Sequence, residues 1–544
     1  MISSKKFLGA GILLWSIMNS PGFAEDWSYK VRPGDNIWNI SERFLTSVLY
    51  WKKLQAKNHI TDPRHIPPGT IVKIPIKWLN KSPMVARVRS AVGVVEITED
   101  FNGKTREVRV GDYIFIDDAL HTADNSTATI EFVDGSTLLI QPNSQLKFDL
   151  VGIYPGTGMT ETWLKLEQGR VETNVAPQKG EASRFEIGTP AGVTSVRGTD
   201  YRVSAESAAA ESRTEVVTGR VAVASQGKSR LVNQGFGIVA SLSAPLKAPI
   251  PLLKPPELAS LPAVVERIPI QLKINRLEGA GRFRVQLSPS FQFDTVIYDR
   301  TFQGQTGRIL DLPDGHYFLR IRGIDQHLLE GLNAAYEFTL NARPEAPFLI
   351  EPGPDKGVTE ATPRFVWAQL QSAQHYYFQM ATDSAFTDVI IDAPQLSDAE
   401  FIPGENLALG QYFWRVASKN NEEGLGPFSD IQTFRRIMPA PEAEQPEISD
   451  TQLTMRWRNG LAGQKYQFQM AADSSFSSPL IDTVTDDAKL IIDRPQSGDY
   501  FVRIRTIEPD GFVGPYGEAQ TIHVPVEFNF WWLLALPLLG LIAL

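Results

Sequence analysis

The chain has 544 residues, a formal net charge of −9 at pH 7 and no cysteine. A chain of this length comprises several domains, at roughly 100 to 200 residues each. The acidic balance argues against a nucleic-acid partner, which needs a concentrated basic face. The lack of cysteine excludes disulfides, thiolate metal ligands and a cysteine nucleophile.

The N-terminus has the pattern of an export signal. Lys5 and Lys6 precede an apolar run over residues 7–18, and the small residues Gly22 and Ala24 follow it. The run is too short to span a bilayer, and small residues at this spacing suit cleavage after Ala24. We therefore expect residues 1–24 to be a signal peptide that is removed on export.

Residues 29–75 predict the order strand, helix, helix, strand. A turn at Pro33 and Gly34 precedes Asp35, which we expect to cap the first helix. Two faces with helical spacing follow. They consist of Ile37, Ile40, Ser41 and Phe44 in the first helix and of Trp51, Leu54, Gln55 and Asn58 in the second. A second turn at residues 68–69 then leads into a strand over residues 71–74.

This segment resembles a LysM module, the small βααβ domain that binds glycans containing N-acetylglucosamine, including bacterial peptidoglycan. We assign the module to residues 27–78. The resemblance is carried by Val31, Gly34, Asp35, Ile37, Ile40, Trp51, Leu54, Asn58, Ile60, Asp62, Pro63, Ile66, Pro68, Gly69, Ile74 and Pro75. It implies that sugars bind in a shallow groove between two loops.

The groove residues implied by the resemblance are Gly34, Asp35, Asn36, Ile37 and Trp38 in one loop and Asn58, His59, Ile60, Thr61 and Asp62 in the other. Backbone amides in such a groove can pair with an acetamido group while apolar faces cover its methyl and ring. The alternative is structural, because turn and cap chemistry alone accounts for Gly34, Asp35 and Asn58. The functional prediction therefore depends on the two loops together.

Residues 85–240 predict one all-β domain, because apolar and polar residues alternate in short runs separated by glycine-containing turns. The segment resembles the FecR domain, which in its known members relays a signal across the bacterial envelope. The matching motifs lie at residues 111–112, 120–122, 132–136, 166–171, 189–190, 196–201 and 218–221. For the motif Arg197-Gly198-Thr199, we favour a tight turn at Gly198, with Arg197 paired inside the fold, over a ligand contact.

Residues 241–264 are rich in proline, which favours the extended polyproline form. We expect this segment to be a semi-rigid linker that separates two independently folding parts.

An internal repeat follows the linker. Similar aromatic-arginine motifs occur at residues 315–321, 410–416 and 498–504, about 90 residues apart. Trp367 and Trp457 each precede their copy on a short alternating stretch. We therefore expect three β-sandwiches with fibronectin type III-like or related immunoglobulin-like architecture, at residues 265–343, 344–437 and 438–526.

Residues 528–544 are apolar to the end of the sequence. We expect this segment to form a hydrophobic helix that contacts or anchors in a membrane, with Trp531 and Trp532 at its polar edge. Burial against the last sandwich is the alternative.

No motif for catalysis was identified. The seven histidines show no metal-ligand spacing, and nucleophile-elbow, metalloprotease and phosphate-loop motifs are missing. We therefore expect no enzyme activity, no cofactor and no metal, although a glycosidase carboxylate pair need not be visible in a sequence.

The sequence thus predicts a mainly β, multi-domain protein of the Gram-negative periplasm that binds peptidoglycan and an unidentified envelope protein. The alternatives are a signalling protein of the FecR type and, third, a peptidoglycan hydrolase. A cleaved signal peptide and a LysM module stand where the FecR relay would need a cytoplasmic segment.

Overall fold

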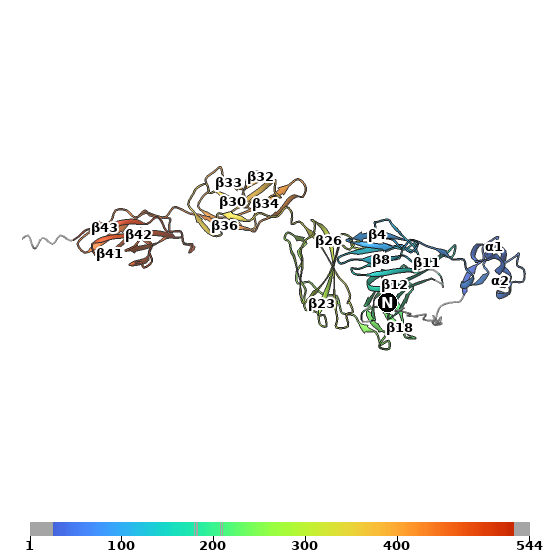
Figure 1. The fold of residues 1–544 in the computed structure, drawn as a ribbon. Helices are drawn as coiled ribbons and strands as arrows, with labels where there is room; N and C mark the ends of the chain where they lie inside the picture. The colour runs from blue at the N-terminus through green and yellow to red at the C-terminus, as the bar shows by residue number, and fades with distance from the viewer. Residues whose placement is uncertain (1–25, 179, 181–182, 207, 209, 527–544) are drawn as a thin grey trace, which may run out of the picture. The chain divides into compact units, whose positions relative to one another are not determined.

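The computed structural model describes residues 26–178, 180, 183–206, 208 and 210–526 (Figure 1). The chain forms two compact units, Met1–Asn341 and Ala342–Leu544. The predicted signal peptide and the predicted C-terminal hydrophobic helix lie outside the described residues. None of the helices in the described part of the chain has the length and apolar composition that a membrane span needs.

The first unit begins with the predicted strand, helix, helix, strand order. The elements are β1 (Asp26–Lys30), α1 (Ile37–Phe44), the 3-10 turn η1 (Val48–Tyr50), α2 (Trp51–Lys57), β2 (Ile71–Pro75) and η2 (Ile76–Trp78). Strands β1 and β2 pair antiparallel. The predicted face of α1 is confirmed, since Ile37, Ile40, Ser41 and Phe44 are its buried residues.

The prediction for the helix cap was wrong by one residue. Asn36, not Asp35, is the N-cap of α1: its Oδ1 accepts from the Asn39 backbone N–H at 2.9 Å, and the Asn39 Oδ1 accepts from the Asn36 N–H at 2.8 Å. Asp35 is instead engaged by Tyr29, whose hydroxyl donates to it at 2.5 Å. Both residue types cap helices well, so the local sequence did not distinguish them.

The next eighteen strands form the predicted all-β domain. They are β3 (Ser82–Pro83), β4 (Ala86–Val92), β5 (Val95–Thr98), β6 (Thr105–Glu107), β7 (Tyr113–Ile114), β8 (Ala119–Thr122), β9 (Thr127–Glu131), β10 (Thr137–Ile140), β11 (Gln145–Tyr154), β12 (Met159–Asn174), β13 (Arg184–Thr189), β14 (Gly192–Val196), β15 (Asp200–Glu206), β16 (Glu211–Thr218), β17 (Arg220–Ser225), β18 (Lys228–Asn233), β19 (Phe236–Ser241) and β20 (Ile250–Pro251). Their pairings close into a barrel.

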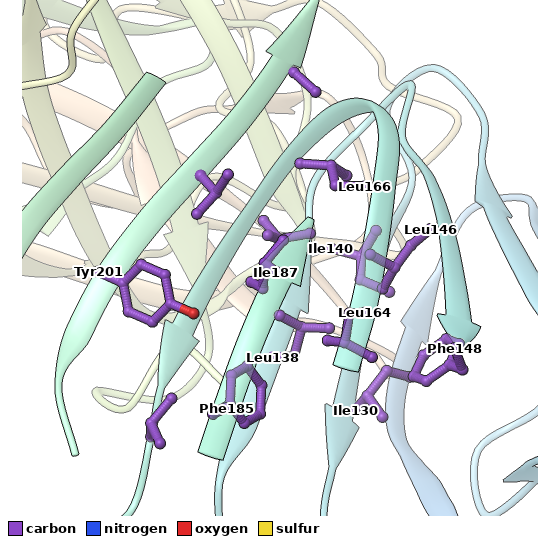
Figure 2. Close-up of a cluster of buried hydrophobic side chains, with 14 of the residues drawn as sticks. Ile130, Leu138, Ile140, Leu146, Phe148, Leu164, Leu166, Phe185, Ile187 and Tyr201 are labelled. Carbon is purple, nitrogen blue, oxygen red and sulfur yellow. The ribbon is translucent and has the colours of Figure 1, made fainter. Parts of the chain in front are cut away.

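The long strand β12 organises this β domain. Its first part pairs with β11 and β13, and its last part pairs with β10 and β15. Alternate side chains therefore converge on one apolar core, in which Figure 2 shows Leu138, Leu164, Phe185 and Ile187 close together. Gly198 has a φ of +107°, which supports the predicted turn, but Arg197 is exposed rather than inside the fold.

The first sandwich completes the unit Met1–Asn341. Its strands are β21 (Val264–Val265), β22 (Ile270–Lys273), β23 (Arg282–Ser288), β24 (Tyr298–Gln303), β25 (Thr306–Ile309), β26 (Gly315–Ile324) and β27 (Ala334–Leu340). They form one sheet in the order β21-β27-β26-β23-β24 and a second sheet of β22 and β25.

The expectation that residues 241–264 hold the β domain and this sandwich apart was wrong. Strand β20 lies within the segment and pairs with β19. The Leu253 carbonyl accepts from the Leu332 N–H of the sandwich at 2.9 Å, and the Leu252 N–H donates to Gly235 of the β domain at 2.8 Å. The apolar residues between the prolines pack against both the β domain and the sandwich. Proline content alone does not reveal this packing.

The second unit contains the other two sandwiches. The second sandwich has β28 (Leu349–Glu351), β29 (Lys356–Val358), β30 (Phe365–Trp367), β31 (His375–Ala381), β32 (Val389–Leu396), β33 (Glu400–Phe401), β34 (Gly410–Asn420), β35 (Gly424–Phe428) and β36 (Gln432–Arg436). The third has β37 (Glu447–Ile448), β38 (Gln452–Arg456), β39 (Lys465–Ala471), β40 (Ile481–Thr485), β41 (Lys489–Asp493), β42 (Gly498–Ile507) and β43 (Gln520–Val524). Trp367 and Trp457 are buried.

Candidate glycan-binding groove

The structure brings the two predicted groove loops together. The Ile37 N–H at the start of α1 donates to the Pro63 carbonyl, which follows the second loop, at 3.0 Å. The side-chain amide of Gln55 on α2 donates to the Ile60 carbonyl at 2.9 Å and holds that loop against its own helix. Residues distant in sequence therefore form one continuous edge of the module.

Five of the predicted groove residues present surface to solvent. Trp38 is 50% exposed, and Gly34, His59, Thr61 and Asp62 are also exposed. His59 adopts a left-handed backbone conformation, with a φ of +52°, that turns the chain out of α2. This combination of an aromatic face and exposed backbone suits a neutral acetamido sugar.

The other five residues build the loops. Ile37 is buried in the module core, Asn36 is the helix cap, and Ile60 is partly buried. Asp35 is buried, and burial alone would raise the pKa of its carboxyl. The hydrogen bonds from the Tyr29 hydroxyl and the Arg32 N–H, at 2.5 and 2.8 Å, outweigh burial and lower that pKa below its usual value.

Asn58 also has a structural role. Its Nδ2 donates to the carbonyls of Leu54 and Lys73, each at 2.9 Å, and its Oδ1 accepts from the Lys73 N–H at 2.6 Å. These bonds tie α2 to β2 and engage both N–H groups and the oxygen of the side-chain amide. Asp35 and Asn58 therefore each have a structural role in the module, of the kind that the structural alternative expects.

Trp51 makes two contacts beside the groove that the sequence does not predict. The rings of Trp38 and Trp51 lie 6.3 Å apart between centroids, and the Lys52 ammonium lies 5.5 Å from the Trp51 ring. Trp51 is partly buried. Its helical spacing predicts only that it lies on the packed face of α2. Its distance from Trp38 was not visible in the sequence, because the two residues lie on different helices.

The neighbouring β domain contributes to the core of this module. Tyr154, the last residue of β11, and Met159, the first residue of β12, are buried with Phe44 and Leu45. The Tyr154 hydroxyl donates to Glu161 at 2.9 Å, and Lys81 pairs with the same carboxylate at 2.7 Å. A hollow of about 380 Å³ lined by Gln141 and Arg170, and another of about 600 Å³ beside β1, are not lined by the predicted groove residues.

Within the described ranges, no group of three or more histidine, aspartate and glutamate side chains could hold a metal ion.

Comparisons with known proteins agree with the two modules. Residues 29–75 match the LysM domain family, and residues 118–222 match the family described as FecR protein. No curated protein is similar enough to this chain to count as a relative.

Solved structures that match parts of this chain include a candidate anti-sigma factor from Parabacteroides distasonis, at 14% identity and a TM-score of 0.21. That match covers 24% of this chain and spans 57% of the length of the anti-sigma factor chain. Three fibronectin domains of chicken CNTN1 match at 14% identity and a TM-score of 0.19, over 50% of this chain and 98% of theirs. Two fibronectin type III domains of chicken tenascin match at 14% identity and a TM-score of 0.23, over 33% and 100%.

The order of elements in residues 29–75, the all-β fold around residues 118–222 and these family matches agree with one another. The chain thus joins a LysM module to a FecR-like β domain and continues into β-sandwich repeats.

Proposed function

We propose that this protein is a non-catalytic component of the bacterial envelope, exported to the periplasm, which binds peptidoglycan through the LysM groove. The observation that carries the proposal is the junction of the two loops at the Ile37–Pro63 hydrogen bond, with Trp38 and Thr61 exposed beside it. The FecR-like domain and the sandwiches then act as contact surfaces for an envelope protein.

The described carboxylates whose pKa values are clearly shifted all favour the ionised form. A glycosidase needs a carboxylic acid whose pKa is raised so that it can protonate the leaving group. Among the described residues, every carboxylate with a clearly shifted pKa is shifted downward. Burial would raise the pKa of Glu172, but Arg320, Arg322 and Arg202 lower it to about 2.

Envelope signalling is the second candidate, and the match of residues 118–222 to the FecR family favours it. In that case the LysM module fixes the position of a sensor. Crosslinking in intact envelopes, followed by identification of the partner, separates this role from a purely structural one.

We expect Thr61→Glu to abolish co-sedimentation of the full chain with purified peptidoglycan, because it places a charged side chain in the groove. Trp38→Ala should weaken binding by about tenfold, or ~1.4 kcal/mol, by removing an apolar face for the sugar ring. Asn36 is a poor test position, since its replacement removes the helix cap.

Thr46→Glu is the matched control. Thr46 is an exposed threonine of the same module outside both loops, so the variant adds the same charge and should sediment like the parent chain. Equal sedimentation of Thr61→Glu and Thr46→Glu would refute the assigned groove.

A further inference from the structure

The three sandwiches share one arrangement of polar side chains on their larger sheet. Strand pairing places Gln286, Gln379 and Gln469 opposite Arg320, Arg415 and Arg503, respectively. Each arginine donates to its glutamine, with the closest N–O distances between 2.7 and 2.8 Å. Each arginine also lies over a phenylalanine ring, Phe293, Phe386 or Phe476, at 4.0 to 4.3 Å from the centroid.

The second and third sandwiches cover this arginine with an aromatic ring of their own. In the second, the Phe428 ring lies 4.1 Å from the Arg415 guanidinium. In the third, the Tyr516 ring lies 4.2 Å from Arg503 and 4.3 Å from Arg505. We call Phe428 and Tyr516 the aromatic lids.

The first sandwich has Asn333 where the others have a lid. The bridges Ile324–Glu330 and Ile507–Val513 and the pairing of Lys419 with Leu425 mark equivalent positions. The residue three positions after Glu330 is Asn333. The residues three positions after Val513 and Leu425 are the lids Tyr516 and Phe428. No aromatic residue of this sandwich therefore stands at the lid position over Arg320.

The FecR-like domain occupies the uncovered face. Glu172 on β12 pairs with Arg320 at 3.0 Å and with Arg322 at 3.2 Å. Arg202 on β15 donates to the Asn333 Oδ1 at 3.0 Å and to the Gly331 carbonyl at 2.9 Å.

The bridge position itself also differs between the sandwiches. Glu330 stands where the other sandwiches have the apolar residues Leu425 and Val513. Its carboxylate pairs with Arg170 of the FecR-like domain at 3.3 Å, and its N–H donates to Glu215 at 3.1 Å. Burial would raise the pKa of Glu330, but the surrounding arginines keep it well below its usual value.

We propose that Asn333 and Glu330 make the first sandwich a dedicated docking surface for the FecR-like domain, and that the aromatic lids close the same surface on the other two. A ring at position 333 would fill the space in which Arg202 meets Asn333. Arg202 would then lose an acceptor while remaining buried, which is unfavourable for a charged group. The face of the FecR-like domain that carries Glu172 and Arg202 is accordingly reserved for the chain's own sandwich, so an external partner contacts another face.

The test exchanges the lid in the full chain. Because the chain has no cysteine, Ser229→Cys and Thr301→Cys, at exposed positions on β18 and β24, provide a unique pair of spin labels. We expect a narrow inter-label distance distribution in the parent and a broad one after Asn333→Tyr. A distribution that stays narrow in Asn333→Tyr would overturn the proposal.

Tyr516→Asn is the matched control, since it removes a lid from the third sandwich and should leave the distribution narrow. A broad distribution in this control would also contradict the proposal. Glu172→Lys is a second variant, which repels Arg320 and Arg322 without changing the first sandwich. It should broaden the distribution, and a narrow one would show that these contacts do not determine docking.

Discussion

Glu330→Leu is expected to lower the free energy of unfolding of the unit Met1–Asn341 by about 3–5 kcal/mol, the cost of breaking a buried ion pair. The Glu330 side chain is 1% exposed and pairs with Arg284 at 2.7 Å and with Arg170 at 3.3 Å. Leucine is the residue of the second sandwich at the equivalent position, so the backbone of a sandwich accommodates it there. The loss comes from arginines that stay buried without their carboxylate.

Urea unfolding of the full chain measures this loss, with hydrogen exchange in β23 and β26 as the readout for this unit. Glu337→Leu is the control, because Glu337 is an exposed glutamate of the same sandwich and should change stability by at most about 0.5 kcal/mol. Equal stabilities of the two variants would mean that the buried network contributes little to the unit.

Trp367→Ala is expected to destabilise the second sandwich by about 3–5 kcal/mol, because it leaves a cavity of indole size in a packed core. Trp367 is 1% exposed. Its ring stacks on Phe378 with 6.1 Å between centroids and lies edge-on to Tyr376 with 5.5 Å between centroids. The third sandwich repeats the same contacts around Trp457, so a matched loss is expected there.

Calorimetry of the full chain should show one thermal transition shifted down and the others unchanged. Phe348→Ala removes an aromatic residue that is 78% exposed in the same sandwich, and it should leave that transition in place. A comparable shift in both variants would contradict the assignment of Trp367 to the core.

The local sequence was sufficient for most of the LysM module. Helical spacing identified the buried face of α1, because Ile37, Ile40 and Phe44 recur every three or four residues. The cap was misassigned because Asp35 and Asn36 are adjacent and equally suitable; the hydroxyl of Tyr29, which engages Asp35, lies on another element.

The contacts between domains were not predictable from patterning. Glu172 and Arg320 are 148 positions apart. The alternation of polar and apolar residues in β12 and β26 does not show that the polar face of one strand contacts the polar face of the other. Charged residues on a strand usually indicate a solvated face, yet the side chains of Arg320 and Glu172 are only 12% and 16% exposed. Asn333 lies outside the repeat motif at residues 315–321, so the motif alone does not show that an aromatic lid is missing from the first sandwich.

The groove is the central element of the proposed function, and the indole signals of the tryptophans can test it. The full chain, labelled with nitrogen-15 at tryptophan, is titrated with a soluble oligosaccharide of N-acetylglucosamine, and Trp38→Phe identifies the Trp38 signal. We predict that the Trp38 signal shifts in a saturable way while those of Trp367 and Trp457, buried in the sandwich cores, stay in place. A Trp38 signal that does not move at any oligosaccharide concentration would contradict the assignment of glycan binding to this groove.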